Sequence, residues 1–331
     1  MTLRRGEPTA SLAQPARAGI PVEPWRGLEG RDRLEAWRAN VGEPVSLDLA
    51  PPASGTVVSS LAILSWNLWI GRGRLGEAIA RVRDATSASL VVLVQEAFRA
   101  DLSVPSRRGV RRAAGGFPPR AIPRADIVDL ARELRLNLRY VPSMRNGAGP
   151  SDRGNAILSE LPLGDARGFE LPLVLQRRVP LVATLALPSG PLHLVSAHLD
   201  PRGPAGAAVV GGAGRARQTA HLLDRLGGDL VVLGADLNLS RGKRERAWRL
   251  LADAGFATGV PPARHPWRHT FHALPRLVLD YLLLRDRGGR VPVARVERLD
   301  EHPRDRGATV FGSDHHPLLA QLELSTTGGL S

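Results

Sequence analysis

The feature that most constrains the fold of this chain is a series of short apolar segments of strand length that begins near Ser59. The strongest lie at residues 61–66, 90–94, 155–158, 179–187, 192–197, 230–234, 279–284 and 317–324. Helical patterns, with apolar residues three and four apart, occur between them at residues 75–84, 125–135, 215–226 and 245–254. Consecutive apolar positions are typical of strands buried on both faces. The alternation predicts a mixed α/β domain whose sheets pack on each other beneath helices.

The residues before this series differ in composition. Residues 1–58 are rich in Pro, Gly and Arg and contain one helical pattern, at residues 31–40. We therefore predict an N-terminal extension (1–58), a catalytic domain (59–325) and a short tail (326–331). Within the domain, two segments rich in Gly, Pro, Arg or Ala are expected to be loops, at residues 101–123 and 201–214.

Composition limits the partners and the location of the protein. No segment of about 18 apolar residues could span a bilayer, and no apolar stretch follows the basic pair near the N-terminus, so we expect a soluble, cytoplasmic protein. The net charge of +13 favours an anionic partner. Because Lys243 is the only lysine, an arginine-rich genome composition explains this charge equally well. The chain has no cysteine, so any metal must be bound by oxygen or imidazole ligands.

Polar side chains follow the apolar segments where each is expected to end. They are Asn67, Glu96, His198, Asp236, Asn238, Asp314 and His315. Any one of them alone is explained by a helix cap or a turn. Together they would be costly to bury unless they bound a cation or an oriented substrate.

Cleavage of a phosphoester requires groups that neutralise phosphate oxygens, deprotonate a water and stabilise the leaving oxygen. With only oxygen and imidazole ligands available, Mg²⁺ or Mn²⁺ is the expected cation. Asn67 and Glu96 are suitable ligands. A histidine oriented by a carboxylate could act as a general base near neutral pH.

The ordered set of motifs resembles the endonuclease/exonuclease/phosphatase superfamily over residues 60–325. The motifs are Trp66-Asn67-Leu68, Gln95-Glu96, Gly154-Asn155-Ala156-Ile157-Leu158-Ser159, Ser196-Ala197-His198-Leu199, Gly234-Ala235-Asp236-Leu237-Asn238, Leu279-Asp280-Tyr281 and Ser313-Asp314-His315-His316-Pro317. Each motif is weak by itself, but their order and spacing together are specific.

The resemblance implies a four-layer α/β/β/α sandwich, with the site at one edge of two sheets. It implies metal ligands at Asn67 and Glu96, with Asp314 near the metal or the phosphate. His198 would contact the scissile phosphate and protonate the leaving group, and Asp236 would activate the attacking water. Asn238 would bind a phosphate oxygen or the metal, Asp280 would orient His315 as the general base, and Asn155 and Arg178 would contact the substrate.

The substrate is less constrained than the chemistry. The loop at residues 101–123 carries arginines that could neutralise successive phosphates, at positions Arg107, Arg108, Arg111, Arg112 and Arg120. We therefore predict a phosphodiesterase acting on nucleic acid, either an endonuclease or an exonuclease. The alternatives are a phosphomonoesterase or lipid-headgroup phosphodiesterase with the same site, and an inactive relative that binds nucleic acid. His316 is excluded from the catalytic set, and the histidines outside the motifs are interpreted as structural or surface residues.

Overall fold

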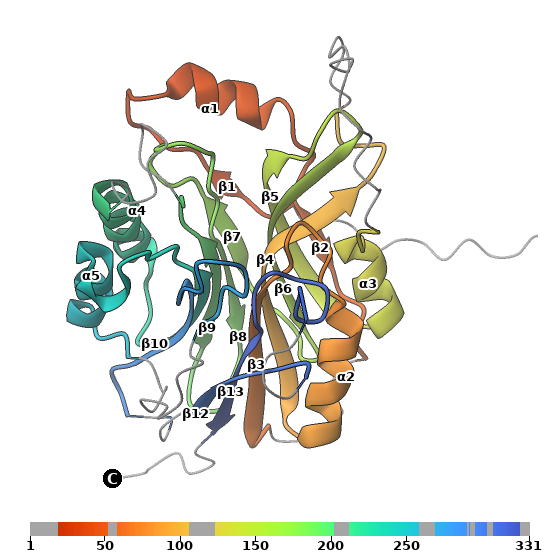
Figure 1. Cartoon of the computed structure of the whole chain (residues 1–331). Helices are drawn as coiled ribbons and strands as arrows, with labels where there is room; N and C mark the ends of the chain where they lie inside the picture. The colour runs from red at the N-terminus through yellow and green to blue at the C-terminus, as the bar shows by residue number, and fades with distance from the viewer. Residues whose placement is uncertain are drawn as a thin grey trace, which may run out of the picture.

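The architecture is a sandwich of two mixed sheets with helices on both outer sides (Figure 1). The computed structural model describes residues 19–51, 58–105, 123–201, 212–257, 269–289, 291, 295–302 and 307–324. The predicted α/β/β/α arrangement is confirmed. The predicted tail, and the arginines between residues 107 and 120, lie outside the described residues. Among the described helices, none is both long and apolar enough to cross a membrane.

One sheet has seven strands in the order β12-β13-β3-β4-β6-β5-β2. Its strands are β2 (Val45–Leu47), β3 (Ser60–Asn67), β4 (Ser89–Ala100), β5 (Asn137–Arg145), β6 (Ser151–Ser159), β12 (Arg295–Arg298) and β13 (Leu318–Glu323). Strands β3 and β4 are parallel, and the other neighbours are antiparallel. Helices α2 (Leu75–Ala85) and α3 (Ile127–Leu134) cover its outer face (Figure 1).

The other sheet has six strands in the order β1-β7-β8-β9-β10-β11. Its strands are β1 (Val22–Glu23), β7 (Ala166–Phe169), β8 (Leu181–Leu185), β9 (Leu192–His198), β10 (Leu230–Asp236) and β11 (Asp280–Asp286). Its outer face packs on α4 (Gly212–Arg225) and α5 (Arg246–Asp253). The short helix η1 (Gly242–Arg244) comes directly before α5 in the sequence. The predicted loop at residues 201–214 was therefore too long, because α4 begins at Gly212.

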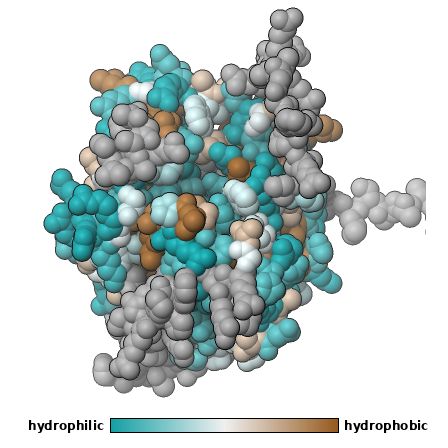
Figure 2. All heavy atoms as spheres, in the orientation of Figure 1, coloured by the Kyte–Doolittle hydropathy of each residue, from teal (hydrophilic) through white to brown (hydrophobic). Residues whose placement is uncertain are grey.

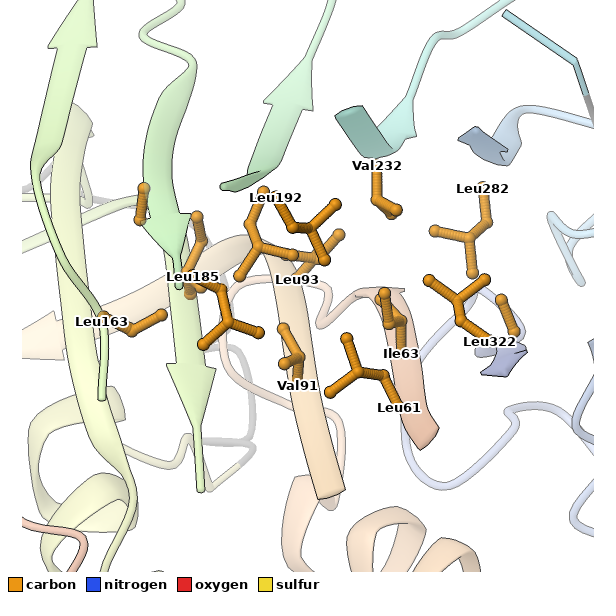
Figure 3. Close-up of a cluster of buried hydrophobic side chains, with 14 of the residues drawn as sticks. Leu61, Ile63, Val91, Leu93, Leu163, Leu185, Leu192, Val232, Leu282 and Leu322 are labelled. Atoms are coloured by element: carbon orange, nitrogen blue, oxygen red, sulfur yellow. The ribbon is translucent and has the colours of Figure 1, made fainter. Parts of the chain in front are cut away.

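The alternation of side chains along each strand explains why the strand segments are apolar at consecutive positions. Leu61 and Ile63 of β3 point between the sheets, where they join Val232 of β10 and Leu282 of β11 (Figure 3). Leu64, one residue on from Ile63, belongs to the separate cluster beneath α2 and α3. Burial of each such aliphatic side chain contributes about 1.5–3 kcal/mol. Both faces of the central strands must therefore be apolar.

Strand direction determines where polar side chains collect. Strands β3 and β4 run parallel, as do β9 and β10, so each pair carries its C-terminal residues to one edge of its sheet. At the end of the second pair, Asp236 lies opposite His198 in the register. Strand β11 is antiparallel to β10, so its first residue, Asp280, is the partner of Asp236.

The N-terminal segment contributes to both sheets. Strand β1 pairs with β7 and strand β2 pairs with β5, and helix α1 (Arg31–Arg38) lies between β1 and β2 in the sequence. Leu34 of α1 is fully buried. Residues 19–50 therefore pack against the rest of the molecule, and the proposed domain boundary at residue 58 stays a prediction.

Candidate active site

The polar strand ends meet a C-terminal turn formed by residues 313–317. The Ser313 hydroxyl donates to the backbone oxygen of Asn67 at 2.7 Å and accepts the His315 N–H at 3.1 Å. The indole N–H of Trp66 donates to the backbone oxygen of His315 at 2.8 Å. Trp66 is fully buried, so it packs in the core. These bonds hold His315 against the end of β3.

His315 and Asp280 form a hydrogen-bonded pair. The Nδ1 atom of His315 lies 2.7 Å from Oδ2 of Asp280. The Thr270 hydroxyl accepts the N–H groups of Leu279 and Asp280, both at 2.9 Å, which holds this end of β11 in place. Burial alone would lower the pKa of His315, but the charge and hydrogen bond of Asp280 outweigh it and raise the pKa to about 10. The Asp280 carboxylate therefore stabilises the charged form of His315.

Asp236 is the centre of the arrangement. Its Oδ2 accepts the amide of Asn67 at 2.9 Å and lies 3.3 Å from Nε2 of His198 and 4.0 Å from Nε2 of His315. Its Oδ1 accepts the backbone N–H of Asn238 at 3.0 Å. Burial, together with the negative charge of Asp280, raises the pKa of Asp236 to about 7. Asp236 can therefore exchange a proton near neutral pH.

His198 and Asn238 lie on either side of Asp236. Burial and the positive charge of Arg178 hold the pKa of His198 well below its usual value, so its imidazole is neutral at pH 7. Asn238 has a left-handed backbone, with φ of 52°, and its side-chain amide donates to the oxygen of Leu199 at 3.0 Å. A neutral imidazole and a turn of this kind can present N–H groups to a bound anion.

Glu96 reaches the same edge through an irregularity in β4. The register of β4 against β6 shifts between Val94 and Ala97, and Glu96 has a φ of 52°. Such a bulge re-aims a side chain that would otherwise alternate with its neighbours. The Glu96 carboxylate lies 4.0 Å from Nδ1 of His198 and remains 20% exposed. The preceding residue, Gln95, is instead buried and bonded to Ser196 and Gly234 of the other sheet.

The predicted metal ligands offer oxygen atoms at this edge. Within the described part of the chain, Oδ1 of Asp314 is buried and accepts no hydrogen bond, and burial raises the pKa of this carboxyl. The Glu96 carboxylate is partly exposed, and the amide oxygen of Asn67 accepts the N–H of Trp69 at 3.0 Å. Carboxylate and amide oxygens with room for water suit Mg²⁺ or Mn²⁺. These residues therefore fit a divalent cation.

A second group of side chains near this edge has metal-ligand geometry. The ligand atoms of Asp236, Asp280 and His315 lie within 4.8 Å of one another. The direct bond between His315 and Asp280 accounts for much of this proximity. The assignment of metal binding to Asn67, Glu96 and Asp314 stays a prediction.

A small pocket lies beside these groups. Its lining includes Glu96, Asn155, Arg178 and His198, together with Arg153. Asn155 donates to the backbone oxygen of Val179 at 2.7 Å, and its Oδ1 is buried with no hydrogen-bond partner among the described residues. Asn155 and Arg178, both predicted to bind substrate, thus lie in one pocket with the catalytic edge.

Two residues of the site were not predicted from the sequence. Arg153 lies two positions before Asn155 on β6, and this spacing places both on one face of a strand. Burial and the nearby Arg178 lower its pKa, although Glu96 acts in the opposite direction. Asp200 is fully buried and bonds to Arg178 at 3.2 Å and to Gln218. The period-two spacing could have identified Arg153, whereas nothing in the sequence identifies Asp200.

Comparisons with known proteins agree with this fold. A family model described as "Endonuclease/Exonuclease/phosphatase family" matches residues 64–315. A protein of that family from Leptotrichia buccalis C-1013-b is similar in structure, with a TM-score of 0.53, 14% identity and coverage of 80% of this chain and 99% of that one. A search of curated proteins found no significant match.

Two further solved structures share the fold. The human Nocturnin catalytic domain with bound sulfate anion has a TM-score of 0.52 and 16% identity, covering 85% of this chain and 98% of that one. D. rerio TDP2 humanized by 14 mutations has a TM-score of 0.51 and 14% identity, covering 80% of this chain and 99% of that one.

Proposed function

The chain belongs to the endonuclease/exonuclease/phosphatase family, whose members hydrolyse phosphoester bonds, and from that premise we propose that it is a metal-dependent phosphodiesterase acting on nucleic acid. The observation that carries the proposal is the buried set of Asp236, His315 and Asp280, in which His315 is hydrogen-bonded to Asp280, beside a pocket lined by Arg153 and Arg178. It combines groups that move protons with groups that bind a phosphate.

The pocket residues would bind and orient the phosphate. The guanidinium groups of Arg153 and Arg178 match the geometry of phosphate oxygens, and buried arginines interact with them more strongly than exposed ones do. Neutral His198 would donate a hydrogen bond to the same group. When bound, a divalent cation at Asn67, Glu96 and Asp314 would neutralise phosphate charge and lower the pKa values of nearby acids.

Asp236 and His315 would accept and transfer the proton of the attacking water. Asp236 has a pKa of about 7, which is close to the pH at which a general base works best. Asp280 would hold His315 in one orientation and stabilise its charged form, as a carboxylate does when it is bonded to a catalytic imidazole. His315 acts as the base only in its neutral form, which requires a lower pKa than that of the metal-free protein.

Charge favours nucleic acid over the alternative substrates. The net charge of +13 attracts a polyanion, and arginine contacts to several phosphates make binding dependent on salt. On the face shown in Figure 2, small hydrophobic groups are scattered among hydrophilic residues, without a broad apolar patch among the residues coloured by hydropathy. A membrane-inserting surface on this face would be more apolar than this.

The proposal is tested by cleavage assays of the purified chain. Plasmid DNA, single-stranded DNA, RNA, a simple phosphodiester and a phosphomonoester are incubated with Mg²⁺, with Mn²⁺ or with a chelator. We expect metal-dependent cleavage of a polynucleotide that weakens as salt is increased. Preference for the monoester or for a phospholipid headgroup would instead support the alternative hydrolases. Binding of nucleic acid without metal-dependent turnover would support the inactive relative.

Substitutions test the site itself. Asp236→Ala and His315→Ala are each expected to lower kcat by about 10² or more, the usual effect of removing a proton-transfer group. Asp224→Ala and His302→Ala are the matched controls, because those side chains are 76% and 59% exposed and lie outside the site. Equal activity in the site variants and in the controls would contradict the mechanism.

A further inference from the structure

We propose that His269, His272 and His316 bind a transition-metal cation, with Zn²⁺ as the fitting ion, behind the catalytic turn. The ligand nitrogens of these three histidines lie within 4.8 Å of one another, and all three residues are buried. Three imidazoles without a carboxylate ligand suit Zn²⁺ better than Mg²⁺, which prefers oxygen. The site is separate from the oxygen-rich edge and does not depend on the proposed substrate.

The spacing of two of the nitrogens matches tetrahedral coordination. Nδ1 of His272 lies 3.3 Å from Nε2 of His316. Zinc binds imidazole nitrogen at about 2.0–2.1 Å, so two ligands of a tetrahedral ion are separated by about 3.3–3.4 Å. The His269 nitrogen lies within 4.8 Å of the other two.

The outer contacts of these rings decide where their protons lie. Nε2 of His272 is 3.0 Å from the backbone oxygen of Gly307, which can only accept, so this nitrogen carries the proton. Nδ1 of His316 faces a carboxylate oxygen of Asp300 at 3.0 Å and the backbone oxygen of Leu299 at 3.4 Å. By the same reasoning, that nitrogen is also a donor.

Two neutral rings with these tautomers would point lone pairs at each other across 3.3 Å. That arrangement is repulsive unless a cation lies between the rings or one of them carries a second proton. Zinc-binding histidines commonly donate their outer N–H to a carboxylate or a backbone carbonyl, and backbone oxygens accept from the outer nitrogens of His316 and His272. The outer contacts therefore favour a metal ion between the rings.

The cluster is joined to the catalytic turn through the backbone. The His316 N–H donates to the oxygen of Thr270, and the His272 N–H donates to the oxygen of Asp314, both at 2.7 Å. Thr270 also positions Asp280, the partner of His315. An ion held by His272 and His316 would fix the turn that carries His315 and the segment in which Thr270 positions Asp280.

The test uses the full chain, stripped of metal and then dialysed against Zn²⁺ with Mg²⁺ in large excess to occupy the oxygen-rich site. We expect one tightly bound Zn²⁺ per chain and a higher Tm than with a zinc-selective chelator at the same Mg²⁺. Substitution with Co²⁺ should give the visible absorption of a tetrahedral ion with nitrogen ligands. If the wild-type chain neither binds one Zn²⁺ nor shows the rise in Tm, the proposal is overturned. This outcome does not depend on whether the variants fold.

Variants assign the ion to the cluster. His272→Gln and His316→Gln should weaken Zn²⁺ binding at least 100-fold, and Asp300→Asn should weaken it about 10-fold as an outer partner. His193→Gln, at a half-buried histidine of β9, and Glu96→Gln, at the catalytic edge, should retain the ion. If Glu96→Gln loses Zn²⁺ and His272→Gln retains it, the ion lies beside Glu96 and the proposal is wrong. Stabilisation of the cluster by acid alone, with no response to Zn²⁺, would identify a protonated histidine pair instead.

Discussion

At the scale of single residues, the charge of the site depends on which side chains carry a proton. His315 has a pKa of about 10 and Asp236 a pKa of about 7, while His198 is neutral. Burial contributes to all three shifts; the carboxylates around His315 act on His315 and Asp236, and the positive charge of Arg178 acts on His198. Polar residues at strand ends therefore become a coupled set only because they lie within a few ångströms of one another in a buried site.

Replacement of Asp280 tests this coupling directly. Asp280→Asn removes the negative charge beside Nδ1 of His315, so the pKa of His315 should fall in the metal-free protein. The pKa is measured by an NMR titration of the histidine ring protons. We also expect kcat to fall by about 10³, since the carboxylate both orients the imidazole and stabilises its charged form. Asp224→Asn, an exposed change on α4, is the control, and an unchanged His315 pKa in Asp280→Asn would contradict the assignment.

At the scale of the elements, the site depends on how closely neighbouring strands approach each other. A Cβ added at Gly154 of β6 would lie 1.9 Å from the backbone oxygen of Val141 in β5. The register between these strands shifts between Pro142 and Met144, next to the pocket residue Ser143. The glycine permits this contact, which holds the Arg153 and Asn155 face of β6 in position.

The contact predicts opposite effects for two glycine substitutions. Gly154→Ala should lower the free energy of unfolding by about 3 kcal/mol, because backbone atoms must move to admit the methyl group. Gly76→Ala in α2 meets no atom within 4 Å and should raise stability by about 0.5–1 kcal/mol through helix propensity. Urea unfolding of both variants is the measurement. Equal stability of the Gly154→Ala variant and the wild-type chain would show that β5 and β6 do not pack this closely.

A buried ion network joins helix α1 to the six-stranded sheet. The Glu170 carboxylate accepts hydrogen bonds from Arg38 of α1 and from Arg177. Burial alone would raise the pKa of Glu170, but these arginines outweigh it and hold the pKa below its usual value. A depressed carboxyl pKa stabilises the fold above the unfolded pKa of about 4.3, and this contribution is lost as the pH falls through the folded pKa.

The network predicts a pH-dependent effect of one substitution. Glu170→Gln should destabilise the fold by about 3 kcal/mol at pH 7, because it leaves buried Arg177 without its counter-charge. The difference from wild type should shrink below about pH 4, where the wild-type carboxyl becomes protonated. Glu77→Gln, whose side chain is 59% exposed, is the control and should change stability by less than about 0.5 kcal/mol. Chemical unfolding across pH 3–8 measures both, and a Glu170→Gln effect that is independent of pH would refute the ion-pair account.

The N-terminal segment completes the fold at the scale of the whole molecule. Its backbone pairs with an edge of each sheet, and the N–H of Gly42 donates to the buried carboxylate of Asp152 at 2.9 Å. Arg99, bonded to that carboxylate, also donates to the backbone oxygen of Glu43 at 2.7 Å. The segment therefore covers strand edges and satisfies buried charges of the domain.

Truncation tests this role. Removal of residues 1–58 should lower the Tm substantially and increase aggregation, because it exposes two strand edges and the Asp152 charge. Removal of residues 1–18 alone keeps β1, α1 and β2 and is the control. Thermal unfolding and light scattering are the measurements. If both truncated chains are as stable as the full one, the segment is a dispensable extension.

The sequence by itself determined the fold class, the segments that become helices and central strands, and the ordered polar strand ends. Periodicity is a local signal, and the burial of both faces of a central strand is visible in its residues. Strands β5 and β7 were missed because β5 contains Pro142 and several polar residues, and β7 has only four residues. Their pairing depends on neighbours distant in the sequence.

Only the tertiary structure decided which side chains meet and which protons they hold. His272 and His316 are 44 positions apart, and no spacing rule predicts their contact at 3.3 Å. The re-aimed Glu96, the position of Arg153 in the pocket and the raised pKa of His315 likewise depend on distances through space. The physical reason is that electrostatic and coordination energies depend on separation and burial, which the chain acquires only when the two sheets pack together.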